Sequence, residues 1–114
     1  AGTVVQFYVV ATNSAGGVSM LPAAGAASRA LYVVHDGRTS SIPARELRII
    51  MLPAESATML SSLNLLSNAL TGGTLVAGGT DVFYDVGVRL QGSAAGRARD
   101  GADYQSFNVD LNAE

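Results

Sequence analysis

The first third of the chain carries apolar runs that are typical of β-strands. Residues 3–12 form a mostly β-branched and aromatic run that is apolar on both alternating faces, as in a strand that is buried on two sides. Residues 13–17 supply turn formers that tolerate positive φ, and residues 18–21 can return as a second strand. The pattern therefore predicts a hairpin over residues 3–21, followed by a further strand over residues 30–34.

The middle of the chain predicts one strand followed by one helix. Residues 46–52 form a β-prone run, and Pro53 suits the first turn of a helix because its missing N–H costs nothing there. Gly72 and Gly73 are expected to end this helix near residue 71. Apolar residues at helical spacing predict one buried face. Its members are Met59, Leu60, Leu63, Leu66 and Leu70.

The last third alternates between apolar and polar positions. Residues 81–91 show the clearest period of two, which predicts a half-buried antiparallel strand. The residues that share one face of this strand are Val82, Tyr84, Val86, Val88 and Leu90. Shorter strands are expected at residues 75–77 and 106–111. The predicted fold class is α+β, with about six or seven mostly antiparallel strands and one amphipathic helix near residues 53–71.

Composition and charge narrow the classes of function. Charged residues make up 14% of the 114 residues, every basic residue is Arg, and the net charge is −2. This balance argues against a nucleic-acid partner, which would require a clustered basic surface. No stretch reaches the ~18 apolar residues of a membrane span. The absence of Cys excludes disulfides and thiolate zinc sites.

Residues 5–16 resemble the penultimate strand and turn of an immunoglobulin-like or fibronectin-type-III-like module. Two later stretches resemble the opening of the spore-coat kinase-like (CotH) family: residues 46–71, and residues 83–93 with the sequence Phe-Tyr-Asp-Val-Gly-Val-Arg-Leu-Gln-Gly-Ser. Residues 106–111 resemble the strand that follows in that family. The resemblance predicts a segment 1–37 from the end of a β-sandwich, a linker 38–45, and the start of a CotH-like α+β domain at 46–114.

The CotH resemblance implies a nucleotide close to Arg89, Ser93 and the loop that follows them. Arg97 and Arg99 lie in that Gly/Ala-rich loop, where they could hold a phosphate or remain solvated. Phosphoryl transfer also needs metal-holding carboxylates and a positioned base, and in this family those acids follow beyond Glu114. We therefore expect at most part of a pocket for ATP and a divalent metal, with no catalytic residue in this chain.

Four aspartates in the second half of the chain suggest an alternative to a nucleotide site, namely a calcium site. Their spacing does not fit an EF-hand loop, and loop acids are usually only solvated. No metal ligand is therefore assigned. The aspartates in question are Asp81, Asp85, Asp100 and Asp103.

Two β-prone segments without Pro, residues 4–10 and 47–52, would pair readily with other strands at an open sheet edge. We expect a non-enzymatic structural or interaction segment of a secreted or cell-surface bacterial protein, which adds strands to copies of itself or to neighbouring modules. No cofactor is expected in this case. The alternative is the N-terminal part of a CotH-like kinase. The candidate edge residues are Val4, Val5, Phe7, Val9, Leu47, Ile49 and Ile50.

Overall fold

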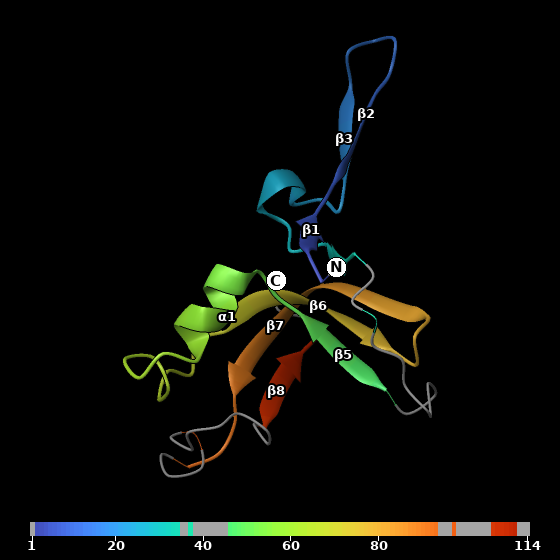
Figure 1. Cartoon of the computed structure of the whole chain (residues 1–114). Coiled ribbons are helices and arrows are strands. Elements are labelled where there is room, and N and C mark those ends of the chain that lie inside the picture. Colours follow the sequence, from blue (N-terminus) through green and yellow to red (C-terminus); the bar gives the residue numbers. More distant parts are fainter. Residues whose placement is uncertain (1, 35–36, 38–45, 94–96, 98–105, 112–114) are drawn as a thin grey trace.

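The computed structural model describes residues 2–34, 37, 46–93, 97 and 106–111, and it is β-rich (Figure 1). Within these residues every strand pairing is antiparallel and the sheets are accompanied by the α-helix α1, which confirms the predicted α+β class. The elements are β1 (Val4–Gln6), β2 (Val9–Thr12), β3 (Val18–Leu21), the 3-10 turn η1 (Gly25–Ala27), β4 (Leu31–Val33), β5 (Leu47–Ile50), α1 (Pro53–Met59), β6 (Thr71–Ala77), β7 (Asp81–Leu90) and β8 (Phe107–Asp110).

A four-stranded sheet in the order β5-β6-β7-β8 forms the body of the molecule. Its apolar core lies where β6 and β7 meet α1, and the inward side chains of β7 are almost completely buried. Gly73 in β6 permits close packing, because a Cβ there would lie 2.9 Å from the carbonyl oxygen of Ile50. The buried core residues are Met59, Leu75, Val86, Val88 and Leu90.

The helix begins at Pro53 as predicted but ends at Met59 instead of near residue 71. Polar side chains after Met59 bind local groups and favour turns over helix: Ser61 Oγ donates to the Thr58 carbonyl at 2.7 Å, and Asn64 Nδ2 donates to Ser61 Oγ at 3.0 Å. The predicted apolar face is consequently wrong beyond Met59. Leu63 is 94% exposed, and the two glycines expected to stop the helix lie inside β6.

The predicted strand over residues 3–12 is divided into β1 and β2, which have different partners. β1 pairs with β4, whereas β2 pairs with β3. The break lies at Phe7, whose N–H donates to the Ala30 carbonyl and whose ring lies 5.9 Å from Tyr32 and 5.6 Å from Tyr84, measured between ring centroids. Packing of this aromatic side chain against the body thus overrides the uninterrupted β pattern of the sequence.

The β2–β3 hairpin projects away from the four-stranded sheet (Figure 1). Its turn forms as predicted: Asn13 Oδ1 accepts hydrogen bonds from the N–H groups of Ala15 at 3.0 Å and Gly17 at 2.8 Å. Gly16 takes a φ of 83°, which suits glycine. A polar network inside the turn therefore fixes the register of the two strands.

β7 is the longest strand and carries an irregularity at Asp85. The register between β6 and β7 shifts between Gly73 and Leu75, so β7 has one extra residue at that point, a β-bulge. Asp85 adopts a left-handed conformation with φ of 55°. The predicted alternation therefore holds from Val86 onward, whereas Tyr84 on the other side of the bulge is exposed.

Among the described residues, no helix has the length and apolar character that crossing a membrane requires.

Candidate functional site

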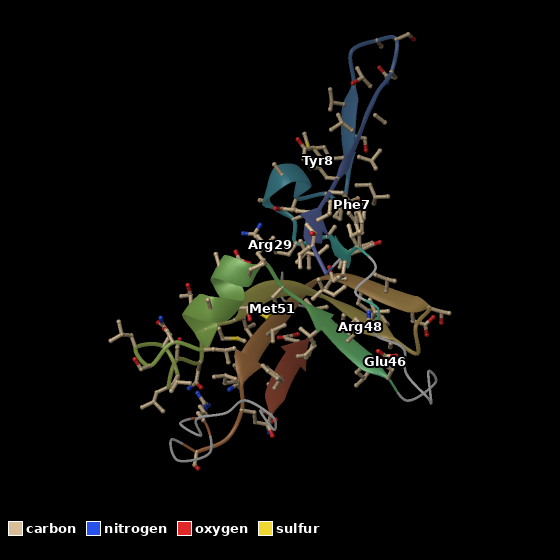
Figure 2. All side chains as sticks on the ribbon, viewed as in Figure 1. Phe7, Tyr8, Arg29, Glu46, Arg48 and Met51 are labelled. Carbon is tan, nitrogen blue, oxygen red and sulfur yellow. The ribbon has the colours of Figure 1, made fainter. Side chains whose placement is uncertain are left out.

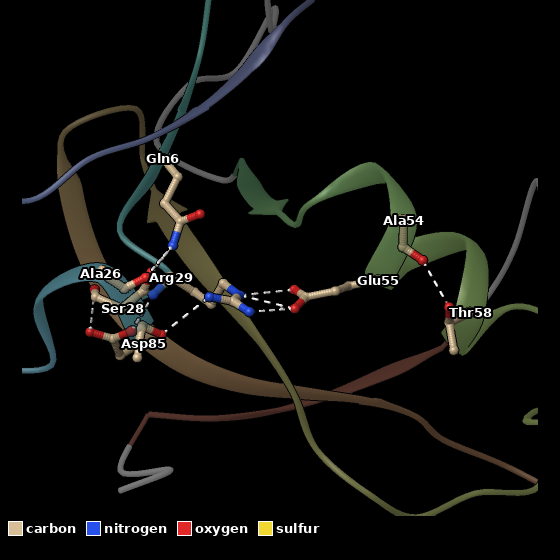
Figure 3. A network of polar contacts seen from close by, with 9 residues as sticks. Gln6, Ala26, Ser28, Arg29, Ala54, Glu55, Thr58 and Asp85 are labelled. Carbon is tan, nitrogen blue, oxygen red and sulfur yellow. Dashed lines mark hydrogen bonds and ion pairs between the residues drawn. The ribbon is translucent and has the colours of Figure 1, made fainter.

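The β-bulge in β7 binds the segment that leads out of the hairpin (Figure 3). Asp85 Oδ2 accepts a hydrogen bond from Ser28 Oγ at 2.8 Å, and Asp85 Oδ1 accepts one from the backbone N–H of Arg29 at 2.5 Å. The left-handed backbone of Asp85 places its carboxylate beside this segment. A bulge is a common device for redirecting a side chain in this way.

Thr74, opposite the bulge, adds two further bonds to the same segment. Its hydroxyl donates to the Arg29 carbonyl at 2.6 Å and accepts from the N–H of Leu31 at 2.9 Å. Ser28 and Thr74 are both completely buried. Because buried polar groups need partners, these paired hydroxyls specify where the N-terminal segment lies on the sheet.

An ion pair connects the same segment to α1. Arg29 Nη2 lies 2.6 Å from Glu55 Oε1, and Arg29 Nε donates to both carboxylate oxygens at 3.0 Å. The hydrogen bond with Glu55 raises the pKa of the Arg29 guanidinium above its ordinary value, so that Arg29 stays charged. The base of the hairpin is therefore held by bonds from β6, β7 and α1.

Beyond this base, the hairpin is exposed on both faces (Figure 2). All eight residues of β2 and β3 are exposed. The side chain of Val9 is 57% exposed and that of Leu21 is 72% exposed. Residues 1–28 contain no Asp, Glu, Lys, Arg or His, so no charge protects these strands. An isolated hairpin of two strands is marginally stable in water, and among the described residues β2 and β3 have no strand partner besides each other.

The second exposed feature is β5, an edge strand of the four-stranded sheet. Within the described residues β5 has β6 as its one neighbour in the sheet. Leu47 at its start is 71% exposed, whereas Ile50 at its end is buried. Beside β5 lies an open groove of about 830 Å³, which is lined by both apolar and polar residues. Residues of β1, β4, β5, α1 and β8 line it, among them Val4, Val33, Ile49, Met59 and Phe107.

The structure places the predicted edge residues at four different locations. Val4 and Val5 lie in β1 and pair with β4, while Phe7 lies between strands and packs on two tyrosines. Val9 lies in the exposed hairpin. The remaining three, Leu47, Ile49 and Ile50, lie in the edge strand β5.

Two of the predicted anion-binding arginines come together at Asn68. Arg89 Nη1 lies 3.4 Å and Arg97 Nη2 lies 3.1 Å from Asn68 Oδ1. Arg97 is buried, and its other N–H groups donate to the carbonyls of Leu65, Ser67 and Gly92 at 2.9 to 3.3 Å. Among the described residues, no carboxylate is hydrogen-bonded to either guanidinium.

Ser93 and Arg97 are joined through the backbone, because the N–H of Arg97 donates to the carbonyl of Ser93 at 3.0 Å. Arg99 lies outside the described residues. Ser93 therefore lies close to the buried arginine, with its side chain exposed.

The described residues contain no group of three or more His, Asp or Glu side chains that could hold a metal ion. Asp85, one of the aspartates considered for calcium, uses both carboxylate oxygens to bind the N-terminal segment. Asp100 and Asp103 lie outside the described residues. The role of Asp85 was missed in the sequence, although an acid within an apolar strand was a visible signal.

Comparisons of the chain with protein-family models, with curated proteins and with solved structures find no significant match.

Proposed function

We propose that this chain is a non-enzymatic interaction segment that associates through its β2–β3 hairpin, by adding strands to the β-sheet of another copy or of a neighbouring module. One observation carries the proposal: all eight strand residues of the hairpin are exposed, with apolar side chains on both faces. Main-chain hydrogen bonding along an open edge supplies the affinity in this mode of recognition, and apolar side chains supply the fit.

The lack of charge along the hairpin supports the same proposal. Natural edge strands commonly carry Lys or Pro, which discourage pairing with other chains. Here residues 1–28 contain no charged residue, and exposed Val, Met and Leu side chains take those places. Such a surface favours a neutral, apolar β-sheet as its partner. A secreted or cell-surface bacterial protein built of such modules is the setting that we propose.

Placing lysines on the strands tests this function. We expect the double variant Val9→Lys, Val18→Lys to associate at least ~10-fold more weakly than the natural chain, since like charges repel and lysine blocks edge pairing. These two residues are not cross-strand partners, so the lysines do not oppose each other within one hairpin. Light scattering over a concentration series measures the association.

The matched control carries the same added charge at the turn. The variant Ser14→Lys, Ala15→Lys places both lysines at the tip of the hairpin, where the two residues lie between the strands. It should associate like the natural chain. Equal weakening of association in both variants would indicate a general effect of charge and not of edge pairing. A natural chain that stays monomeric would contradict the proposal.

The alternative function is that of the N-terminal part of a CotH-like kinase, which would contribute part of a pocket for ATP with a divalent metal. The observation that favours it is the approach of Arg89 and Arg97 to one amide oxygen. Arg97 uses its N–H groups largely on carbonyls, so Arg89 is the residue that would meet a phosphate.

Calorimetric titration with ATP and Mg²⁺ tests this alternative. Arg89→Ala should abolish any binding, because it removes the partly exposed cation. Arg48→Ala is the control, since Arg48 lies on β5, away from Arg89 on β7, and forms an ion pair with Glu46 at 2.9 Å. Binding that survives Arg89→Ala unchanged would rule out this site.

A further inference from the structure

A surface suited to receive the hairpin of another copy is present on this chain, at the edge strand β5. β-strand addition uses an open strand edge, with pockets beside it that accept alternate side chains of the added strand. β5 meets both conditions: in the described part of the chain it has one neighbouring strand, and the groove of about 830 Å³ runs along it. Leu47 at the start of β5 is exposed, and Met59 and Phe107 lie among the residues that line the groove.

The charges around the groove suit a neutral strand. Glu46 and Arg48 are the charged residues of its lining, and they are bound to each other at 2.9 Å. A strand that enters the groove therefore leaves no lone ion without a partner, which would be the costly outcome. An uncharged hairpin fits this condition, whereas a charged peptide would gain no free counter-ion there.

The dimensions of the two elements also correspond. β5 and β3 each contain four residues, as does β2. Along β3, Val18 and Met20 point to one face while Ser19 and Leu21 point to the other, because side chains alternate along a strand. One apolar pair could thus face the groove while main-chain groups pair with β5.

The hairpin of the same molecule is not placed to fill this groove. It projects away from the sheet (Figure 1). Its base is held by the bonds from Asp85 and Thr74 and by the ion pair with Glu55. A contact between a hairpin and this groove would therefore join two molecules.

We infer that the β2–β3 hairpin of one copy adds to the β5 edge of a second copy and buries apolar side chains in its groove. This inference rests on the proposed function and names the receiving surface. The two contacting surfaces differ, so the contact is head-to-tail, and repeating it generates a chain of copies when the rotation does not close.

Cysteine pairing tests the inference, because the natural chain contains no Cys that would compete. Ser19→Cys marks the hairpin and Leu47→Cys marks the exposed end of β5. The two single variants are mixed under mild oxidation, and mass spectrometry measures disulfide-linked heterodimer. We expect it at least ~10-fold above the yield from Ser19→Cys mixed with Thr80→Cys, which lies in the turn between β6 and β7.

The outcomes separate this inference from the proposed function. If Ser19→Cys pairs mainly with itself, the hairpins meet each other, and the β5 inference fails while hairpin association stands. If the chains associate but the Ser19–Leu47 yield stays at the control level, another surface receives the hairpin and the inference also fails. A monomer at all concentrations overturns both.

Discussion

At the scale of single residues, Asp85 connects the four-stranded sheet to the segment that leads out of the hairpin. A left-handed Asp at a bulge binds a hydroxyl and a backbone N–H that lie more than 50 positions earlier in the chain. Thr74 and Ser28 complete this buried polar arrangement. Because the partners are desolvated, removing one acceptor leaves donors without compensation, and this costs more than the bond contributes on balance.

Asp85→Ala should therefore lower the free energy of unfolding by about 1–3 kcal/mol, the range for leaving buried polar groups unpaired. Asp85→Asn should lose less, since Asn tolerates the left-handed conformation and keeps one acceptor oxygen. Urea unfolding measures both. The control is Asp81→Ala at the exposed start of the same strand, with an expected change within ~0.5 kcal/mol. Equal losses at the two positions would contradict the role given to Asp85.

At the scale of elements, local signals were readable in the sequence and tertiary ones were not. The turn at residues 13–17 was predicted because its hydrogen bonds are made within five residues. The start of α1 was also predicted, because the preference of Pro53 for the first helical turn is a local effect. The end of α1 was missed because the apolar spacing continued, while Ser61 and Asn64 favoured turns by local hydrogen bonds.

The division of residues 3–12 into β1 and β2 depends on contacts far along the chain. Phe7 packs on Tyr32 and Tyr84, and the residues next to Phe7 in the sequence do not predict these contacts. The candidate site likewise depends on contacts between residues that are far apart in the sequence. Residues 47–50 were predicted to be a strand from their β-prone sequence, whereas the position of β5 at the sheet edge beside a groove required the fold. The contact between Arg89, Arg97 and Asn68 likewise required the fold.

At the scale of the whole molecule, the chain has a packed body and a projecting arm, and its longest dimension is 57 Å against 34 and 24 Å for the others (Figure 1). The sheet and α1 bury the core residues, while the β2–β3 hairpin leaves its apolar residues in solvent. Hydrogen bonds from residues 28–31 to Asp85 and Thr74 hold the arm to the body. This division of roles supports a body that presents a pairing element to another sheet.

The central claim is that the hairpin becomes paired when copies meet, and amide hydrogen exchange tests it most directly. The rate is followed for peptides covering β2 and β3 at low and at high protein concentration, with β6 and β7 as the internal standard. We predict that exchange in the hairpin slows at least ~10-fold at high concentration, because open edges gain hydrogen-bond partners. The standard should be protected equally at both concentrations. Hairpin exchange that is independent of concentration would contradict the account.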